Sequence, residues 1–263
     1  TVSLTAVELL TVNGGDDADQ ITVTGNVVPE SLTIDGQNGD DIITLQYPIL
    51  SGTLSVDGGA GSADQLLART TTGTDTVMLD ATQLQVAGST TAGYAGFETI
   101  DIDTFGGADT VTVVSTAAGV STDIDTGADG DTITIEATGG PLNVSAGTGA
   151  DSIRVQTIAS PTTINTGSGT DTVLVSSAQN TLSGISDTLQ ISGTQGGPNT
   201  LSIDDSGNTS NATGTLTNDD LTGLGMSGRI EYSFIESLNV TLGSGDDDLT
   251  VASTHDNATV MQA

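Results

Sequence analysis

The segment 122–135, TDIDTGADGDTITI, decides the fold of this chain. It holds a short stretch of alternating apolar residues, a loop of glycine and aspartate, and a second alternating stretch. Asp131 closes the loop seven positions after Ile124. Because a period of two predicts strands with one buried face, the segment predicts two β-strands joined by an acidic turn.

The same unit recurs along the chain. Seven copies start with an apolar residue and close with Asp seven positions later, at Val12, Ile34, Ile102, Ile124, Val144, Ile164 and Val240. Two variants with one inserted residue start at Val56 and Ile191, and the second closes with Asn199. Regular neighbours are 20 or 22 residues apart, which indicates a repeat architecture.

The spacing predicts the geometry of each repeat. A strand of this length spans about 15 Å, so one period forms one flattened rung of two strands. Apolar residues two and four positions after the closing Asp point inward. The expected pairs are Ile21/Val23, Ile43/Leu45, Val111/Val113, Ile133/Ile135, Ile153/Val155, Val173/Val175 and Leu249/Val251. Helical periodicity is absent, so we predict an all-β, parallel β-solenoid (β-roll or β-helix-like) with 20–22-residue rungs and one acidic-loop edge.

Residues 1–263 are expected to form a single continuous solenoid with irregular inserts near 69–99 and 200–236. The steps from Val56 to Ile102 and from Ile191 to Val240 are 46 and 49 residues, about two rungs each, and we expect a hairpin or expanded turn in both. Tyr94 and Tyr232 close the inserts, four residues before Glu98 and Glu236. The glutamates could support a metal site, cap a strand or lie on a solvated edge. The chain lacks an initiating Met, so we expect a segment of a longer repeat protein.

Composition excludes several classes of function. The chain has 34 acidic residues against 3 basic ones, a net charge of −31, and no Cys. Binding to nucleic acid or to an anionic membrane surface needs clustered Lys or Arg, so neither is expected, nor is direct membrane insertion. The three Arg do not share a repeat position, and no carboxylate pair differs from its neighbours in other rungs. We therefore expect no enzymatic activity.

The loop chemistry favours calcium. Glycine allows left-handed backbone that can turn carbonyls inward, and the closing Asp adds an anionic oxygen. Oxygen ligands without His or Cys suit Ca²⁺. Parallel stacking also brings Asp35 near Asp57, and Asp109 near Asp131, so a column of carboxylates would repel itself. Several Ca²⁺ ions between rungs would turn that repulsion into cross-links.

These loops resemble the RTX, or haemolysin-type, calcium-binding repeat GGxGxDxUx. The matching positions are Gly36, Gly39, Asp41 and Ile43; Gly127, Gly130, Asp131 and Ile133; Gly147, Gly149, Asp151 and Ile153; Gly167, Gly169, Asp171 and Val173; and Gly243, Gly245, Asp247 and Leu249. The resemblance implies that loop carbonyls and Asp carboxylates are the calcium ligands. The chain departs from that family's β-roll, which has an acidic turn on both sides of an 18-residue rung, because it has one acidic loop per 20–22 residues.

The expected metal ligands fall into three groups. The closing carboxylates are Asp19, Asp41, Asp64, Asp109, Asp131, Asp151, Asp171 and Asp247. The loop glycines are Gly36, Gly39, Gly127, Gly147, Gly149, Gly167, Gly169, Gly243 and Gly245. A further column one residue after the apolar start is expected to add Asp35, Asp57, Asp103, Asp125 and Asn165.

The resemblance and the repeats together predict an extracellular structural protein of a bacterial cell surface, such as a stalk, matrix fibre or adhesin shaft. Its expected partners are like subunits or further repeats end to end, and glycans or cell-surface components. An ice-binding module, with Thr126, Thr148 and Thr166 in an exposed array, is one alternative. A carbohydrate-binding adhesin that uses the Tyr94 or Tyr232 insert is another.

Overall fold

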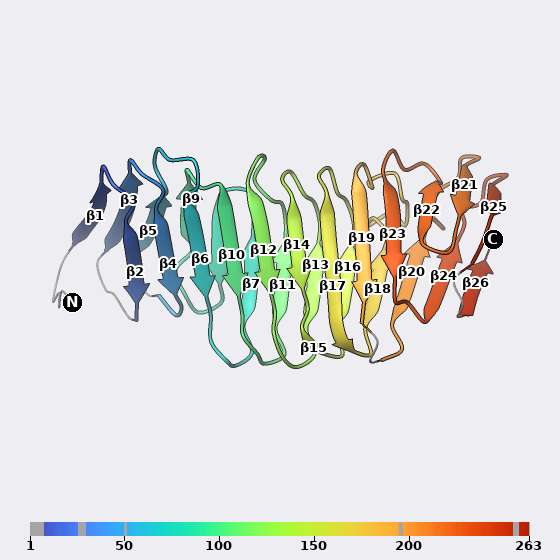
Figure 1. Ribbon diagram of the computed structural model, residues 1–263, viewed down its shortest axis with the longest axis horizontal. Helices are drawn as coiled ribbons and strands as arrows, with labels where there is room; N and C mark the ends of the chain where they lie inside the picture. The colour runs from blue at the N-terminus through green and yellow to red at the C-terminus, as the bar shows by residue number, and fades with distance from the viewer. Residues whose placement is uncertain (1–7, 26–29, 50–51, 195–196, 255–257, 263) are drawn as a thin grey trace.

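The computed structural model describes residues 8–25, 30–49, 52–194, 197–254 and 258–262. Within these ranges the chain contains strands and turns but no helix. Two 13-stranded sheets face each other along an elongated molecule, and the first and last strands, β1 (Leu9–Gly15) and β26 (Ala258–Gln262), lie at opposite ends of the stack (Figure 1). The chain is therefore an all-β solenoid, as the repeats predict.

Each sheet collects one strand from every regular rung. In spatial order the first sheet contains β1 (Leu9–Gly15), β3 (Ser31–Gln37), β5 (Thr53–Asp57), β9 (Ala92–Ala95), β8 (Gln83–Val86), β7 (Thr76–Leu79), β11 (Thr110–Val113), β13 (Thr132–Ile135), β16 (Ser152–Val155), β18 (Thr172–Val175), β20 (Thr200–Asp204), β24 (Ser237–Thr241) and β26 (Ala258–Gln262). The second contains β2 (Gln20–Thr24), β4 (Ile42–Gln46), β6 (Gln65–Arg69), β10 (Thr99–Asp103), β12 (Ser121–Asp125), β14 (Leu142–Ser145), β17 (Thr162–Gly169), β19 (Thr188–Gly193), β23 (Arg229–Ser233), β22 (Asp220–Gly223), β21 (Thr213–Leu216) and β25 (Asp248–Val251), with β15 (Thr148–Gly149) paired to β17.

Regular rungs stack in parallel and in register. Ile133 pairs with Ile153 in the first sheet, and Ile102 pairs with Ile124 in the second. Equivalent positions of successive repeats therefore lie one strand spacing apart, about 4.8 Å. This register places each acidic loop directly against the next.

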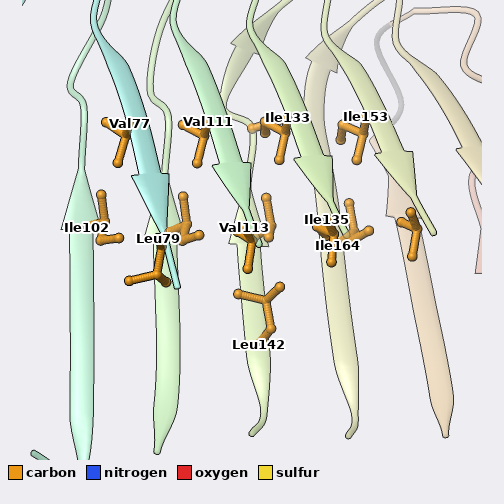
Figure 2. Close-up of a cluster of buried hydrophobic side chains, with 14 of the residues drawn as sticks. Val77, Leu79, Ile102, Val111, Val113, Ile133, Ile135, Leu142, Ile153 and Ile164 are labelled. Carbon is orange, nitrogen blue, oxygen red and sulfur yellow. The ribbon is translucent and has the colours of Figure 1, made fainter. Parts of the chain in front are cut away.

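The apolar core lies between the two sheets. Val77, Val111, Ile133 and Ile153 form one row in Figure 2, from neighbouring strands of the first sheet. All four are at most 1% exposed. The predicted inward positions are buried in the middle rungs, and each such side chain stabilises the stack by about 1.5–3 kcal/mol. At the end rungs Ile21 and Leu249 are only half-buried. Val251 is 41% exposed, because no further described rung covers it.

Two antiparallel meanders interrupt the rungs. In the first, β8 pairs antiparallel with both β7 and β9. In the second, β22 pairs antiparallel with both β21 and β23. They lie within 69–99 and 200–236, where the repeat is irregular. Both sheets continue past each meander without a break.

Each meander moves the acidic loops to the opposite edge of the solenoid. β5 and β9 are parallel, and so are β7 and β11. The first acidic loops follow β1, β3 and β5, whereas the later ones precede β11, β13, β16 and β18. Loops at the upper edge of Figure 1 thus give way to loops at the lower edge, near β15. At the second meander the acidic loops return to the upper edge, with 205–212 leading into the meander and 241–247 following it. Each rung carries one acidic loop as expected, but the prediction of a single acidic edge along the chain is wrong.

The irregular stretch 176–187 does not divide the solenoid. β17 pairs with β19, and β18 pairs with β20, on the two sides of it. Ile158 also bridges Ile185 within this turn region, and both side chains are buried. The stretch is an enlarged turn between rungs.

Candidate metal centres along the acidic loops

The acidic loops form three rows, which we call seams. The first seam consists of loops 13–19, 35–41 and 57–64 at the upper edge. The second consists of 71–75, 103–109, 125–131, 145–151, 165–171 and 192–199 at the lower edge, where 195–196 lie outside the described residues. The third consists of 205–212 and 241–247, again at the upper edge.

Glycine is required in the second seam by both backbone conformation and close packing. Gly127, Gly147 and Gly167 have φ of +88°, +86° and +78°. A Cβ on Gly147 would run into the carbonyl oxygen of Gly127 in the preceding rung. That carbonyl accepts a 2.7 Å hydrogen bond from the Thr148 amide, which holds successive loops together. Loop carbonyls therefore point along the stack.

The other expected loop glycines divide into two kinds. Positive φ angles occur at Gly39, Gly149 and Gly169. Gly36, Gly243 and Gly245 lie outside the left-handed region, and there a Cβ would instead meet a carbonyl oxygen of the neighbouring loop. For these three the reason for glycine is close approach alone.

The closing aspartates form a hydrogen-bonded ladder along each seam. In the first seam the Asp41 carboxylate accepts the Asp19 amide at 2.7 Å, and Asp64 accepts the Asp41 amide at 2.7 Å. In the second seam, the Oδ1 atom of each closing Asp, or of Asn199, accepts the backbone amide of the equivalent residue one rung earlier. These bonds join Asp75 to Asp109, Asp109 to Asp131, Asp131 to Asp151, Asp151 to Asp171, and Asp171 to Asn199 at 2.7–3.2 Å.

Glutamates end two of these ladders. Glu98 accepts the Asp64 amide at 2.8 Å, and Glu236 accepts the Asn199 amide at 2.7 Å. Each Glu follows a meander, at the point where the seam stops. Of the roles left open by the sequence, capping is the one that the geometry shows for Glu98 and Glu236.

The second oxygen of these aspartates is buried without a partner. Oδ2 has no hydrogen-bond donor in Asp41, Asp64, Asp109, Asp131, Asp151, Asp171 and Asp247. The first six of these residues are at most 2% exposed. A buried carboxylate oxygen without a donor costs free energy. In each such rung a buried oxygen is thus available to a cation or a proton.

Burial of the closing aspartates also shifts the pKa of several of them. Burial, opposed by the Asp131 amide and reinforced by the charges of Asp171 and Asp131, raises the pKa of Asp151 to about 6. Burial also raises the pKa of Asp64, Asp109 and Asp131. Without a bound cation, these carboxylates would therefore hold their negative charge unfavourably at neutral pH.

The column one residue after the apolar start shapes the turns. Asp35, Asp57, Asp103 and Asn165 each accept the backbone amide two residues ahead, at 2.9–3.1 Å. These local bonds support the left-handed residue that follows. Burial and the neighbouring Asp103 charge raise the pKa of Asp125. The members of this column are half-buried or exposed, whereas the ladder residues Asp41, Asp131 and Asp171 are buried.

Sequence reasoning missed two members of the seams. Asp75 donates its amide to Asp109, and its own carboxylate accepts the amide and hydroxyl of Thr71. Asp205 is buried and accepts the Leu182 amide and the Asn208 side-chain amide. Neither loop contains the G-x-G pattern, so only stacking reveals them. In the third seam, Asp247 accepts the Ala212 amide at 2.9 Å.

The donor set fits a hard cation bound jointly by side chains and backbone. Among the described residues, no group of three or more His, Cys, Asp and Glu side chains gathers to hold a metal by itself. An ion in a seam would thus need loop carbonyls beside the unpartnered Oδ2 atoms. Both kinds of oxygen suit Ca²⁺.

The residues behind the two alternative functions are mostly buried. Thr126 and Thr166 are fully buried, whereas Thr148 is exposed, so the three do not form a common exposed array. Tyr94 and Tyr232 are 7% and 3% exposed, and their hydroxyls donate to the carbonyls of Asp80 and Thr217. Both tyrosines belong to the meander core and offer no ring face for stacking on a sugar.

No protein-family model and no curated protein matches this chain. Across the described ranges, the structure has no helix with the length and apolar character needed to cross a membrane.

Proposed function

We propose that this chain is an extracellular structural calcium-binding repeat protein, a stalk, matrix fibre or adhesin shaft stiffened by Ca²⁺ ions between rungs. The column of buried Asp Oδ2 atoms without donors carries the proposal. It recurs in all three seams and supplies anionic oxygen at a regular spacing. Several Ca²⁺ ions are the expected cofactors.

Electrostatics supports a divalent cation in this position. Successive closing aspartates lie one hydrogen bond apart through the backbone, as in the 2.8 Å contact from the Asp109 amide to Asp131. The charges of Asp171 and Asp131 help to raise the pKa of Asp151, so neighbouring closing carboxylates disfavour each other's ionisation. A divalent ion bound only by the stacked state stabilises it by mass action. Calcium would thus act as a cross-link between rungs.

The shape and the uniform loops support a mechanical role. The rungs add length in one direction, and each seam carboxylate has the same kind of neighbours as the next, which argues against a catalytic centre. Among the described residues, β1, β2, β25 and β26 are the end strands of the two sheets, and such end strands are suited to pairing with further rungs or like subunits end to end. Glycans or cell-surface components are further proposed partners, at a bacterial cell surface.

The proposed mechanism links folding to location. Calcium sites in extracellular modules bind at roughly 10⁻⁴–10⁻³ M. Such sites stay empty at cytosolic calcium levels, and the repelling carboxylates then disfavour the stacked state. Export into a calcium-rich medium would complete the fold.

Circular dichroism and elemental analysis test this proposal. We expect a strand signal and a melting temperature that rise with Ca²⁺ and fall with EGTA, together with several retained Ca²⁺ ions per chain. Mg²⁺ at equal ionic strength is the control for charge screening. A strand signal that ignores the chelator, in protein that retains no calcium, would overturn the proposal.

A further inference from the structure

The ladders of the first two seams end at the meanders. The first runs from Asp19 to Asp64 and stops at Glu98, and the second runs from Asp75 to Asn199 and stops at Glu236. Because each meander moves the next acidic loop to the opposite edge, no ladder bond crosses from one seam to another. Within the described residues the seams touch only through the apolar core and the strands.

The meanders themselves are built without acidic ladders. The buried carboxylate oxygens without a hydrogen-bond donor all lie outside β7–β9 and β21–β23. Both meanders contribute inward apolar side chains that are at most 3% exposed: Val77, Leu79, Leu84, Val86, Leu216, Leu221, Ile230 and Tyr232. The Tyr94 and Tyr232 hydroxyls fasten the outer strand of each meander to the Asp80 and Thr217 carbonyls.

The meanders also differ from the rungs in chain topology. Leu79 pairs with Leu84, and Leu216 with Leu221, through tight turns. Regular rungs join residues 20 or more apart, such as Ile133 and Ile153. Closing a short loop costs less conformational entropy, and repeat arrays propagate from whichever unit forms first. A meander can therefore order before the acidic rungs beside it.

We propose that the two meanders are metal-independent folding units that divide the solenoid into separately responding calcium blocks, with Glu98 and Glu236 as the residues that close the ladders. The inference rests on the proposed function for the identity of the ion. It adds that occupation of one seam is coupled mainly to sites in that seam, and only weakly to sites across a meander.

Hydrogen exchange measured by mass spectrometry on the whole chain tests this division. In EGTA we expect amides of β7–β9 and β21–β23 to stay protected while the loops of the first and second seams exchange. During a Ca²⁺ titration, loops within one seam should gain protection at a common midpoint. Loss of protection in the meanders together with the loops in EGTA would overturn the inference.

Matched variants test the separation. Asp41→Ala and Asp131→Ala remove equivalent ladder residues from the first and second seams. Each should raise the calcium midpoint of its own seam by about 10–100-fold, and leave the other seam within about twofold. Asp41→Asn and Asp131→Asn, which keep the acceptor for the amide, give the same comparison if an Ala variant fails to fold.

The terminating glutamates give a second comparison. Glu98→Ala should raise the midpoint only in the first seam, and Glu236→Ala only in the second, whereas Glu98→Gln keeps an acceptor and should shift the first seam less. Equal shifts in both seams would refute separate blocks. Wild-type loops whose protection ignores calcium would instead contradict the proposed function, so the two failures are distinguishable.

Discussion

Replacing Asp151 by Asn should change stability in opposite directions with and without calcium. The Asn side chain retains an oxygen that can accept the Asp131 amide, now 2.8 Å from Asp151 Oδ1. Asn199 already occupies an equivalent position and accepts the Asp171 amide. The substitution therefore removes a charge while it preserves the ladder.

The magnitude follows from the acidity of Asp151. Burial raises the pKa of this carboxyl from 3.8 to about 6. A group with a raised folded-state pKa stabilises the fold below its unfolded pKa, and this contribution is lost as pH rises through the folded pKa. At pH 7.5 the ionised group thus costs about 3 kcal/mol relative to a neutral one. In EGTA, Asp151→Asn should recover about 2–3 kcal/mol and raise the melting temperature by roughly 4–12 °C.

In millimolar Ca²⁺ the same substitution should lower stability, because the neutral amide weakens the binding of an ion shared by neighbouring rungs. Thermal and urea unfolding followed by circular dichroism measure both states. Glu136→Gln is the control, since it removes one charge from an exposed turn outside the seams. If Asp151→Asn shifts stability in the same direction in EGTA and in Ca²⁺, the seam does not hold a cation at this rung.

Three further predictions concern the second seam and the metal-free state. Asp131→Ala should reduce the number of bound Ca²⁺ ions measured by elemental analysis, and an unchanged number would exclude this residue as a ligand. In EGTA, the free energy of unfolding should rise as pH falls from 7.5 towards 5, because the folded state takes up more protons than the unfolded one. The reason is that burial raises the pKa of Asp64, Asp109, Asp131 and Asp151. Urea midpoints that fall steadily as pH is lowered over this range would contradict the prediction. The Gly147→Ala variant should be destabilised more than the Gly88→Ala variant, because both glycines have positive φ but only a Cβ on Gly147 would meet a carbonyl oxygen. Equal losses of stability in urea unfolding would mean that the loops are not tightly stacked.

The repeat and its register could be predicted from the sequence, but the change of edge could not. Apolar anchors such as Ile124 and Val144 recur at a fixed spacing, and a one-residue slip would expose the whole inward row. The 46 residues from Val56 to Ile102, however, fit either four or five strands. Only five strands, an odd number, place the next acidic loop at the opposite edge. The turns of the insert decide between four strands and five.

The candidate site was predictable to a similar extent. The closing aspartates are visible as a column in the sequence, because each follows its anchor at the same distance. The hydrogen bonds between closing aspartates depend on which loops are in contact, and so does the capping role of Glu98. The sequence alone does not show these contacts. Asp205 was missed because its loop lacks paired glycines, and its burial arises from the enlarged turn 176–187 that contributes Leu182.

Anomalous diffraction from crystals grown in Ca²⁺, or in Tb³⁺ as its substitute, is the most direct measurement of the central claim. The account predicts peaks between successive acidic loops, within coordination distance of Asp Oδ2 atoms, on the upper edge for residues 13–64, the lower edge for 103–171 and the upper edge again near 247. A folded solenoid that soaks in the same ions and shows no peak along these loops would contradict it.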